Sequence, residues 1–288
     1  MRNRAENFIL LASLCFSFIA LSEYGIGQSL KRERESEVPI RVKYDVVYGR
    51  NDEPMHRADI YQPSVKIEGQ LRPGVILVHG GAWIAGDKSN DVLHAKRMAR
   101  LGFVVMSINY RLAPAHPFPA QIDDCYLALD WFGKQSTDLR LDLDSLGGWG
   151  YSAGGHLIAL VATHPKELRL KACVVGGAPC DLTQIPENSQ MLARLLGGTR
   201  SQYPERYSDA SPVTHVSSDD PPIFLFHGEK DLLVPPNSSI VMRDALEKNH
   251  VPFEYWVVPN KAHLMTFIDK EATEKSFAFL KEQLGKNR

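Results

Sequence analysis

The sequence predicts an α/β fold built around a mostly parallel sheet, with helices on both of its faces. Residues 74–78 form an uninterrupted apolar run, as expected for a strand buried on both faces. Such runs alternate along the chain with segments of helical periodicity, which is the order of a parallel sheet with helical crossovers. A glycine-rich stretch, residues 148–155, lies where one strand is expected to turn sharply into a helix.

The individual elements follow from short-range patterns. Residues 28–39 mix both charge signs and predict a solvated linker. Strands are expected at 41–48, 57–61, 74–78, 103–108, 146–151, 170–175, 222–226 and 253–258, and helices at 91–101, 119–133, 153–163, 240–248 and 266–284. Residues 181–217 contain only one expected helix, at 191–196, and are interpreted as a lid or pocket segment.

The strand-to-helix turn carries the pattern G-x-S-x-G. Ser152 stands between Gly150 and Gly154. A serine side chain can be exposed above a sheet only where the neighbouring backbone is crowded, which requires residues without bulk at those two positions. The pattern alone also fits an ordinary glycine-rich turn. Three further motifs separate the two interpretations: His79-Gly80-Gly81 upstream, His227-Gly228-Glu229-Lys230-Asp231 downstream, and Ala262-His263-Leu264 near the end.

With these motifs in the order Ser, Asp, His, the chain resembles the α/β-hydrolase superfamily. Within it, the chain is similar to carboxylesterases of the feruloyl-esterase-like and hormone-sensitive-lipase-like branches, which carry an HGG motif. Tyr151 and His156 stand where the hormone-sensitive-lipase-like pattern usually has an acid and Asn, which favours a feruloyl-esterase-like or acetylesterase-like branch. The resemblance covers residues 40–288 and implies a catalytic domain whose first strands form an antiparallel edge.

The resemblance implies a catalytic triad. A serine hydroxyl is a weak nucleophile at neutral pH, so it needs a base and an acid that orients the base. Ser152 is expected to be the nucleophile, His263 the base and Asp231 the orienting acid. Glu229 is the competing carboxylate, but its side chain would need a shorter loop to reach.

The HGG motif is expected to supply an oxyanion hole. The backbone N–H groups of Gly80, Gly81 and Ala153 can stabilise the oxygen that becomes negative during attack on an ester. We expect His79 to brace this loop rather than to react, and Trp83 and Tyr151 to line the substrate pocket. A core tryptophan is the alternative for Trp83.

Several polar residues are expected to be structural. Arg111 follows a predicted strand and is interpreted as part of a salt bridge, and His156 as a packing residue. Asp123 and Asp124 lie near a helix start, where they fit the helix dipole. Asp219 and Asp220 precede a strand and are expected to be solvated.

Composition limits the classes of partner. With 44% hydrophobic residues and a formal net charge of −1, the chain can form a substantial core and has no basic field for nucleic acid. A small-molecule or saccharide-borne ester is the expected partner. No cofactor and no metal are expected, because serine hydrolysis needs neither, and the oligomeric state stays open.

The N-terminus predicts export. Arg2 and Arg4 precede an apolar run at 8–21, followed by small residues at Gly25 and Gly27, which is typical of a signal peptide spanning 1–27. The run is short for a membrane span, so no stable span is expected after the leader is removed, and a retained anchor is the alternative. Cys125, Cys173 and Cys180 would then remain, and we expect core thiols.

Together these features predict a secreted or periplasmic serine carboxylesterase that acts on short-chain acyl esters, among them acetyl or feruloyl esters on polysaccharide. The polar composition of residues 181–217 argues against a lipid-facing lid and therefore for short acyl groups. An arylformamidase-like amide hydrolase and a catalytically inactive binding protein with the same fold are the alternatives.

Overall fold

The computed structural model describes residues 38–65 and 69–285. Contacts divide the chain between Pro39 and Ile40, and the unit that begins at Ile40 contains the sheet and its helices. The predicted signal peptide and most of the linker lie outside the described residues.

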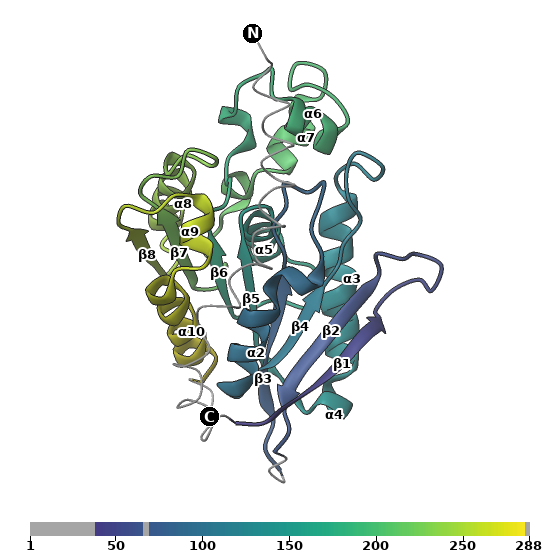
Figure 1. Ribbon diagram of the computed structural model, residues 1–288. Helices are drawn as coiled ribbons and strands as arrows, with labels where there is room; N and C mark the ends of the chain where they lie inside the picture. Colours follow the sequence, from purple (N-terminus) through teal and green to yellow (C-terminus); the bar gives the residue numbers. More distant parts are fainter. Residues whose placement is uncertain (1–37, 66–68, 286–288) are drawn as a thin grey trace, which may run out of the picture. The chain divides into compact units, whose positions relative to one another are not determined.

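The described residues form an eight-stranded sheet in the order β1-β2-β4-β3-β5-β6-β7-β8 (Figure 1). β2 pairs antiparallel with β1 and β4, whereas the other neighbours are parallel. The fold class and the antiparallel edge are therefore confirmed. The strands are β1 (Ile40–Val47), β2 (Arg57–Pro63), β3 (Arg72–Val78), β4 (Val104–Ile108), β5 (Leu141–Tyr151), β6 (Ala172–Gly176), β7 (Ile223–Gly228) and β8 (Phe253–Val258).

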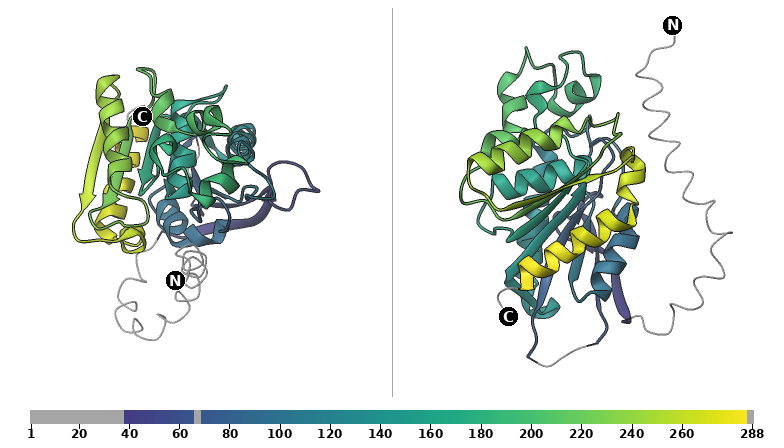
Figure 2. Two further views of the ribbon diagram at one scale, coloured as in Figure 1. Left: turned by 90° about the horizontal axis from the view of Figure 1, so that it is seen from above. Right: turned by 90° about the vertical axis from the view of Figure 1, so that its left-hand side faces the viewer.

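Two layers of helices cover the sheet (Figure 2). One core contains side chains of α3 (Ala120–Lys134), α5 (Ala153–Thr163) and α8 (Asn237–Lys248), and the other those of α2 (Val92–Arg100) and α10 (Lys270–Gly285). Successive strand residues serve opposite cores, because side chains alternate across a strand.

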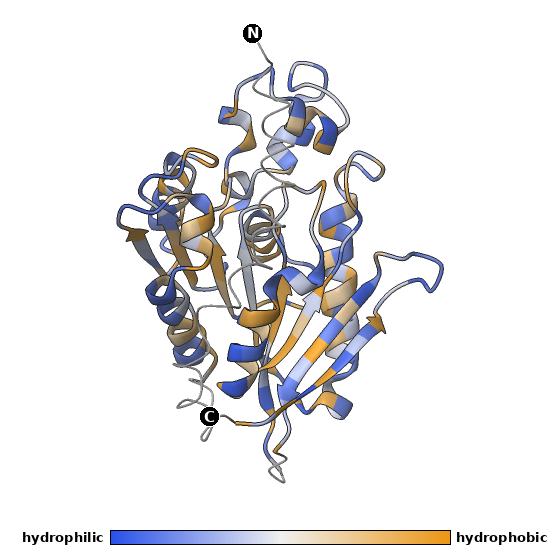
Figure 3. Cartoon of the chain, in the orientation of Figure 1, coloured by the Kyte–Doolittle hydropathy of each residue, from blue (hydrophilic) through white to orange (hydrophobic). Residues whose placement is uncertain are grey.

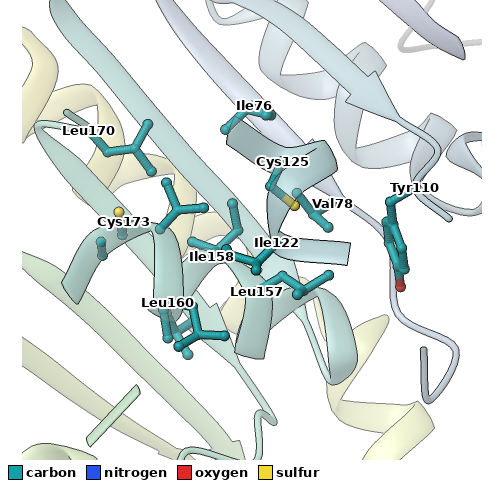
Figure 4. Close-up of a cluster of buried hydrophobic side chains, with 14 of the residues drawn as sticks. Ile76, Val78, Tyr110, Ile122, Cys125, Leu157, Ile158, Leu160, Leu170 and Cys173 are labelled. Atoms are coloured by element: carbon teal, nitrogen blue, oxygen red, sulfur yellow. The ribbon is translucent and has the colours of Figure 1, made fainter. Parts of the chain in front are cut away.

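β3 illustrates this alternation. Ile76 and Val78 belong to the core that contains α5, and Figure 4 shows them beside Leu157 and Ile158 of that helix. Val75 and Leu77 belong to the other core. Figure 3 shows the resulting distribution, with hydrophobic residues along the central strands and polar residues on the outer side of α10.

The helices differ from the prediction mainly after β6. Residues 181–217, which we call the cap segment, contain two α-helices rather than one, and the single helix expected at 266–284 is two helices. The short elements are η2 (Lys88–Asp91), α4 (Ser136–Leu139), η3 (Leu182–Gln184), α6 (Gln190–Leu196), α7 (Pro204–Asp209), η4 (Pro212–His215) and α9 (His263–Phe267). The break between α9 and α10 has a local cause, since the Asp269 carboxylate accepts a hydrogen bond from the Ala272 N–H at 3.0 Å and so caps α10.

Two aspartates differ from expectation. Asp220 is buried rather than solvated, and burial raises its pKa. Its carboxylate accepts the N–H of Ser217 at 3.0 Å in place of water. Asp124 is also buried, and Asp123 is the acidic residue in the first turn of α3. The Asp124 carboxylate is paired. It binds the Arg111 guanidinium at 2.6 Å and His56 Nε2 at 3.0 Å, which confirms the salt bridge expected for Arg111.

The cysteines of the described chain are Cys125, Cys173 and Cys180, and all three are buried free thiols, as expected. Burial raises the pKa of each thiol. No helix within residues 38–65 and 69–285 has the length and apolar content needed to cross a membrane.

Candidate active site

Ser152 occupies a sharp turn between β5 and α5. Its backbone has φ 56° and ψ −123°, a conformation that non-glycine residues rarely adopt. The turn is held by the Ser152 N–H, which donates to the Gly176 carbonyl at 2.8 Å, and by the Ser152 carbonyl, which accepts the His156 N–H at 2.9 Å. An added Cβ at Gly154 would overlap the carbonyl oxygen of Val78. Glycine is therefore required where the pattern G-x-S-x-G places it.

The HGG loop runs directly alongside this turn. A Cβ at Gly80 would lie 3.0 Å from the Tyr151 carbonyl oxygen and 3.4 Å from the Cβ of Ser152. Gly81 has φ +126°, a region that side chains disfavour, and its carbonyl accepts the N–H of Ala85 at 3.0 Å. The two motifs, about 70 residues apart in the chain, thus meet at the carboxyl ends of β3 and β5.

His79 holds the base of the HGG loop. Its Nδ1 lies 2.7 Å from the Gly80 carbonyl oxygen, and its ring stacks on Tyr110 with 4.3 Å between centroids. Tyr110 in turn donates its hydroxyl to the His79 carbonyl at 3.0 Å. Burial lowers the pKa of His79, which favours the neutral ring. These contacts match the bracing role expected for this residue.

His263 and Asp231 form a buried hydrogen bond. His263 Nδ1 donates to Asp231 Oδ2 at 2.6 Å. The other carboxylate oxygen accepts the backbone N–H groups of Leu233 and Val234, each at 2.9 Å. Because Nδ1 is the donor, Nε2 on the opposite edge of the ring is the nitrogen that can accept a proton.

The Asp231 carboxylate is held in its ionised form. Burial alone would raise its pKa, but hydrogen bonding by the neighbouring His227 and by His263 outweighs burial and holds the pKa below its usual range. His227 Nε2 lies 3.4 Å from Asp231 Oδ2 and also 2.8 Å from the Val234 carbonyl oxygen. His227 begins the downstream motif, but its sequence position alone led to no predicted role.

Glu229, the competing carboxylate, points elsewhere. Its Oε2 accepts the backbone N–H of Asn260 at 2.7 Å, so it ties the loop after β7 to the loop after β8. Of the two carboxylates in the motif, Asp231 is the one that His263 contacts.

Tyr151 and Trp83 are both buried beside the turn. The Tyr151 hydroxyl donates to the His263 carbonyl at 2.8 Å, and the two rings lie 5.0 Å apart. Trp83 is only 1% exposed, and its Nε1 donates to His156 Nδ1 at 3.1 Å. Their role as pocket residues stays a prediction, but each has a structural contact that the sequence did not reveal.

His156 connects three parts of the site. Its Nδ1 accepts from Trp83, and its Nε2 donates to the Ala210 carbonyl of the cap segment at 2.6 Å. Burial lowers the pKa of His156 to about 4, so the ring is neutral at physiological pH. The packing role expected for His156 is confirmed, and it joins α5 to the HGG loop and to the cap segment.

Comparisons with known proteins identify the family and the fold. The BD-FAE family model matches residues 58–246, which include Ser152 and Asp231 but not His263. The probable carboxylic ester hydrolase LipM of Mycobacterium tuberculosis (strain ATCC 25618 / H37Rv) is 31% identical over 238 residues, covering 76% of this chain and 55% of LipM. Esterase LipQ of the same strain is 32% identical over 250 residues, covering 81% of this chain and 58% of LipQ.

A solved structure supports the fold. The truncated form of a carbohydrate esterase from gut microbiota superposes with a TM-score of 0.78 at 23% identity, covering 85% of this chain and 97% of that chain. The present chain spans little more than half the length of LipM and LipQ. The family match nevertheless extends over more than half of the chain and confirms the resemblance to the α/β-hydrolases. The chain belongs to the BD-FAE family.

Proposed function

We propose that this protein is a carboxylic ester hydrolase with Ser152 as nucleophile, His263 as general base and Asp231 as the acid that orients it. The observation that carries the proposal is the 2.6 Å hydrogen bond between His263 and Asp231. It is supported by the positive φ of Ser152, whose neighbour Tyr151 donates its hydroxyl to the His263 carbonyl. The names of LipM and LipQ support ester hydrolysis as the reaction.

In the proposed reaction, Ser152 Oγ gives its proton to His263 Nε2 and bonds to the ester carbonyl carbon. The tetrahedral intermediate then expels the alcohol, which takes that proton from His263. Water then gives a proton to His263 Nε2 and bonds to the acyl carbon. Ser152 Oγ leaves the second tetrahedral intermediate with that proton, which releases the carboxylic acid. Asp231 stays ionised throughout and stabilises the imidazolium.

The proposed oxyanion hole consists of the backbone N–H groups of Gly80, Gly81 and Ala153. The support is the close approach of Gly80 to Ser152 and the position of Ala153 as the first residue of α5. Backbone donors fixed in a tight turn need no reorganisation when charge develops, and removing one such donor typically lowers the rate by about 10²–10³-fold.

We propose short acyl groups as substrates. The cap segment carries many polar residues, and three of its leucines, Leu192, Leu195 and Leu196, are buried rather than presented as a lipid-facing surface. The polar cap segment by itself would suit an acetyl or feruloyl ester carried by polysaccharide. The loops around His263, however, carry apolar side chains.

The test of the proposed function is hydrolysis of p-nitrophenyl esters from acetyl to decanoyl by the protein and by Ser152→Ala. The protein should prefer acetyl to butyryl esters, and Ser152→Ala should lower kcat by about 10⁶-fold with the fold retained. A folded Ser152→Ala variant with most of its activity would contradict the assignment. Cleavage of N-formylkynurenine without turnover of any ester would instead indicate an amide hydrolase.

We also propose that the protein is exported. The proposal rests on the sequence of residues 1–27, which lie outside the described residues. Intact mass measurement of protein from its natural host should show loss of the leader near Gly27. A full-length N-terminus in the cytosolic fraction would contradict export.

A further inference from the structure

Five large apolar side chains are exposed on the two loops that carry Asp231 and His263. Two of them follow Asp231, and three lie in or just after α9, which begins at His263 and packs against β7 (Figure 1). A group of exposed apolar side chains at a functional site typically marks a binding surface. These residues are called the apolar rim: Leu232, Leu233, Leu264, Met265 and Ile268.

The two halves of the apolar rim are held together by the site itself. The hydrogen bond from His263 to Asp231 joins the loops, and so does the Lys230 N–H, which donates to the Lys261 carbonyl at 2.9 Å. Leu232 is 94% exposed and directly follows Asp231, whereas Leu264 is 49% exposed and directly follows His263. Both residues therefore lie one residue away from the proposed catalytic pair.

The direction of proton transfer determines which part of the ester lies next to the apolar rim. The departing alcohol oxygen must take its proton from His263 Nε2, so the group attached to that oxygen lies on the histidine side of the breaking bond. The carbonyl oxygen lies on the other side, toward Gly80 and Ala153. A surface next to His263 therefore faces the alcohol part of the ester rather than the carbonyl oxygen.

We infer that the apolar rim binds the alcohol part of the substrate and selects esters of apolar alcohols, alkyl or aryl, over esters of saccharides. This inference rests on the proposed function and narrows it. A hydroxyl-rich saccharide would leave these leucines in contact with water, whereas an alkyl or aryl alcohol would remove them from water and so lower the transition-state free energy.

The experiment holds the acyl group constant and varies the alcohol. Initial rates are measured for methyl, butyl, hexyl and benzyl acetate below their solubility limits, for hexyl acetate also above its limit, and for acetylated xylan. The protein is compared with Leu232→Ser and Leu264→Ser. The matched control is Leu71→Ser, because Leu71 is 52% exposed but precedes β3, at the amino ends of the parallel strands and so away from the site at their carboxyl ends.

The wild-type kcat/KM should rise by roughly tenfold from methyl to hexyl acetate, which is well below the limit for full burial of five methylenes because the rim is open to solvent. Each rim variant should lower the hexyl-to-methyl ratio by about three- to tenfold, and Leu71→Ser should keep the wild-type ratio. Circular dichroism and Tm values that match the wild type would show that the variants are folded.

Four results would overturn the inference while leaving the proposed function intact. They are equal kcat/KM for all acetates, rim variants with an unchanged hexyl-to-methyl ratio, faster deacetylation of xylan than of hexyl acetate, and a rate that rises only above the solubility limit of the ester. The last would indicate adsorption to an aggregate surface. No turnover of any ester would overturn the proposed function, and the inference with it.

Discussion

At the scale of single residues, the Asp231 carboxylate organises the proposed site. One of its oxygens fixes the loop that follows β7, and the other orients His263. Glu229, two residues earlier, binds the backbone of Asn260 instead. The two carboxylates therefore allow a matched test of which one serves the histidine.

Asp231→Asn should lower kcat by about 10⁴-fold, because an amide in this position favours the wrong tautomer of the imidazole. Glu229→Gln should reduce kcat far less, since it changes only a contact between loops. Steady-state kinetics on p-nitrophenyl acetate checks both variants. The opposite ranking would assign the orienting role to Glu229.

The lowered pKa of Asp231 also predicts how stability depends on pH. An unfolded aspartate titrates near pH 3.9, so the ionised folded carboxylate stabilises the protein above that pH. As pH falls below about 4, protonation favours the unfolded chain, and the contribution is lost as pH passes through the lower folded pKa. Urea unfolding at pH 7 and pH 3 should therefore show a wild-type advantage over Asp231→Asn that shrinks at pH 3. An advantage that is constant or larger at pH 3 would contradict this account.

At the scale of elements, close backbone contact fixes the turn from β5 into α5. The backbone of Gly154 packs against the end of β3, where a Cβ would overlap the Val78 carbonyl oxygen. Backbone atoms cannot move aside as a flexible side chain can. Gly154→Ala should therefore lower the free energy of unfolding by about 3 kcal/mol or prevent folding.

Gly285→Ala is the control for this change, because among the described residues no atom beyond its chain neighbours lies within 4 Å of a Cβ at Gly285. Urea unfolding should give a free energy for Gly285→Ala close to that of the wild type. A stable Gly154→Ala protein that retains wild-type activity would show that α5 does not need the observed contact with β3.

The start of α3 is joined to the antiparallel edge by a buried ion pair. Asp124 accepts from Arg111 and contacts His56, which directly precedes β2. Asp124→Ala should lower the free energy of unfolding by about 3–5 kcal/mol, because it removes the buried carboxylate that pairs with the Arg111 guanidinium and with His56 Nε2. Asp130→Ala is the control, since the Asp130–Lys134 pair is exposed. Urea unfolding checks both variants. An equal decrease in the free energy of unfolding for both would contradict a larger contribution from the buried ion pair.

At the scale of the whole molecule, the centre of the sheet could be predicted because its strands there are buried on both faces. β3 and β7 are apolar runs, so sequence composition alone locates them. The cap segment was less predictable because α7 depends on contacts outside its own sequence. Tyr207 of α7, for instance, donates its hydroxyl to the Gly198 carbonyl at 3.1 Å.

In the candidate site too, residues in local motifs could be predicted, whereas contacts between distant residues could not. Local motifs locate Ser152, the HGG loop and Asp231, because each follows a strand and carries its own glycine signature. The hydrogen bond from Tyr151 to the His263 carbonyl joins residues that are 112 positions apart, and no local pattern announces it. The His227 contact with Asp231 lies within one motif, so its spacing of four residues was a signal that could have been used.

The most direct test of the account is covalent labelling with a fluorophosphonate, followed by peptide mass mapping. Such probes react with a serine whose hydroxyl is activated by an adjacent base, so the adduct reports the proposed nucleophile and base together. We expect one adduct on the peptide that contains Ser152, none in Ser152→Ala, and labelling in His263→Ala slowed by several orders of magnitude. Labelling that persists in Ser152→Ala, or proceeds at the wild-type rate in a folded His263→Ala protein, would contradict the proposed triad.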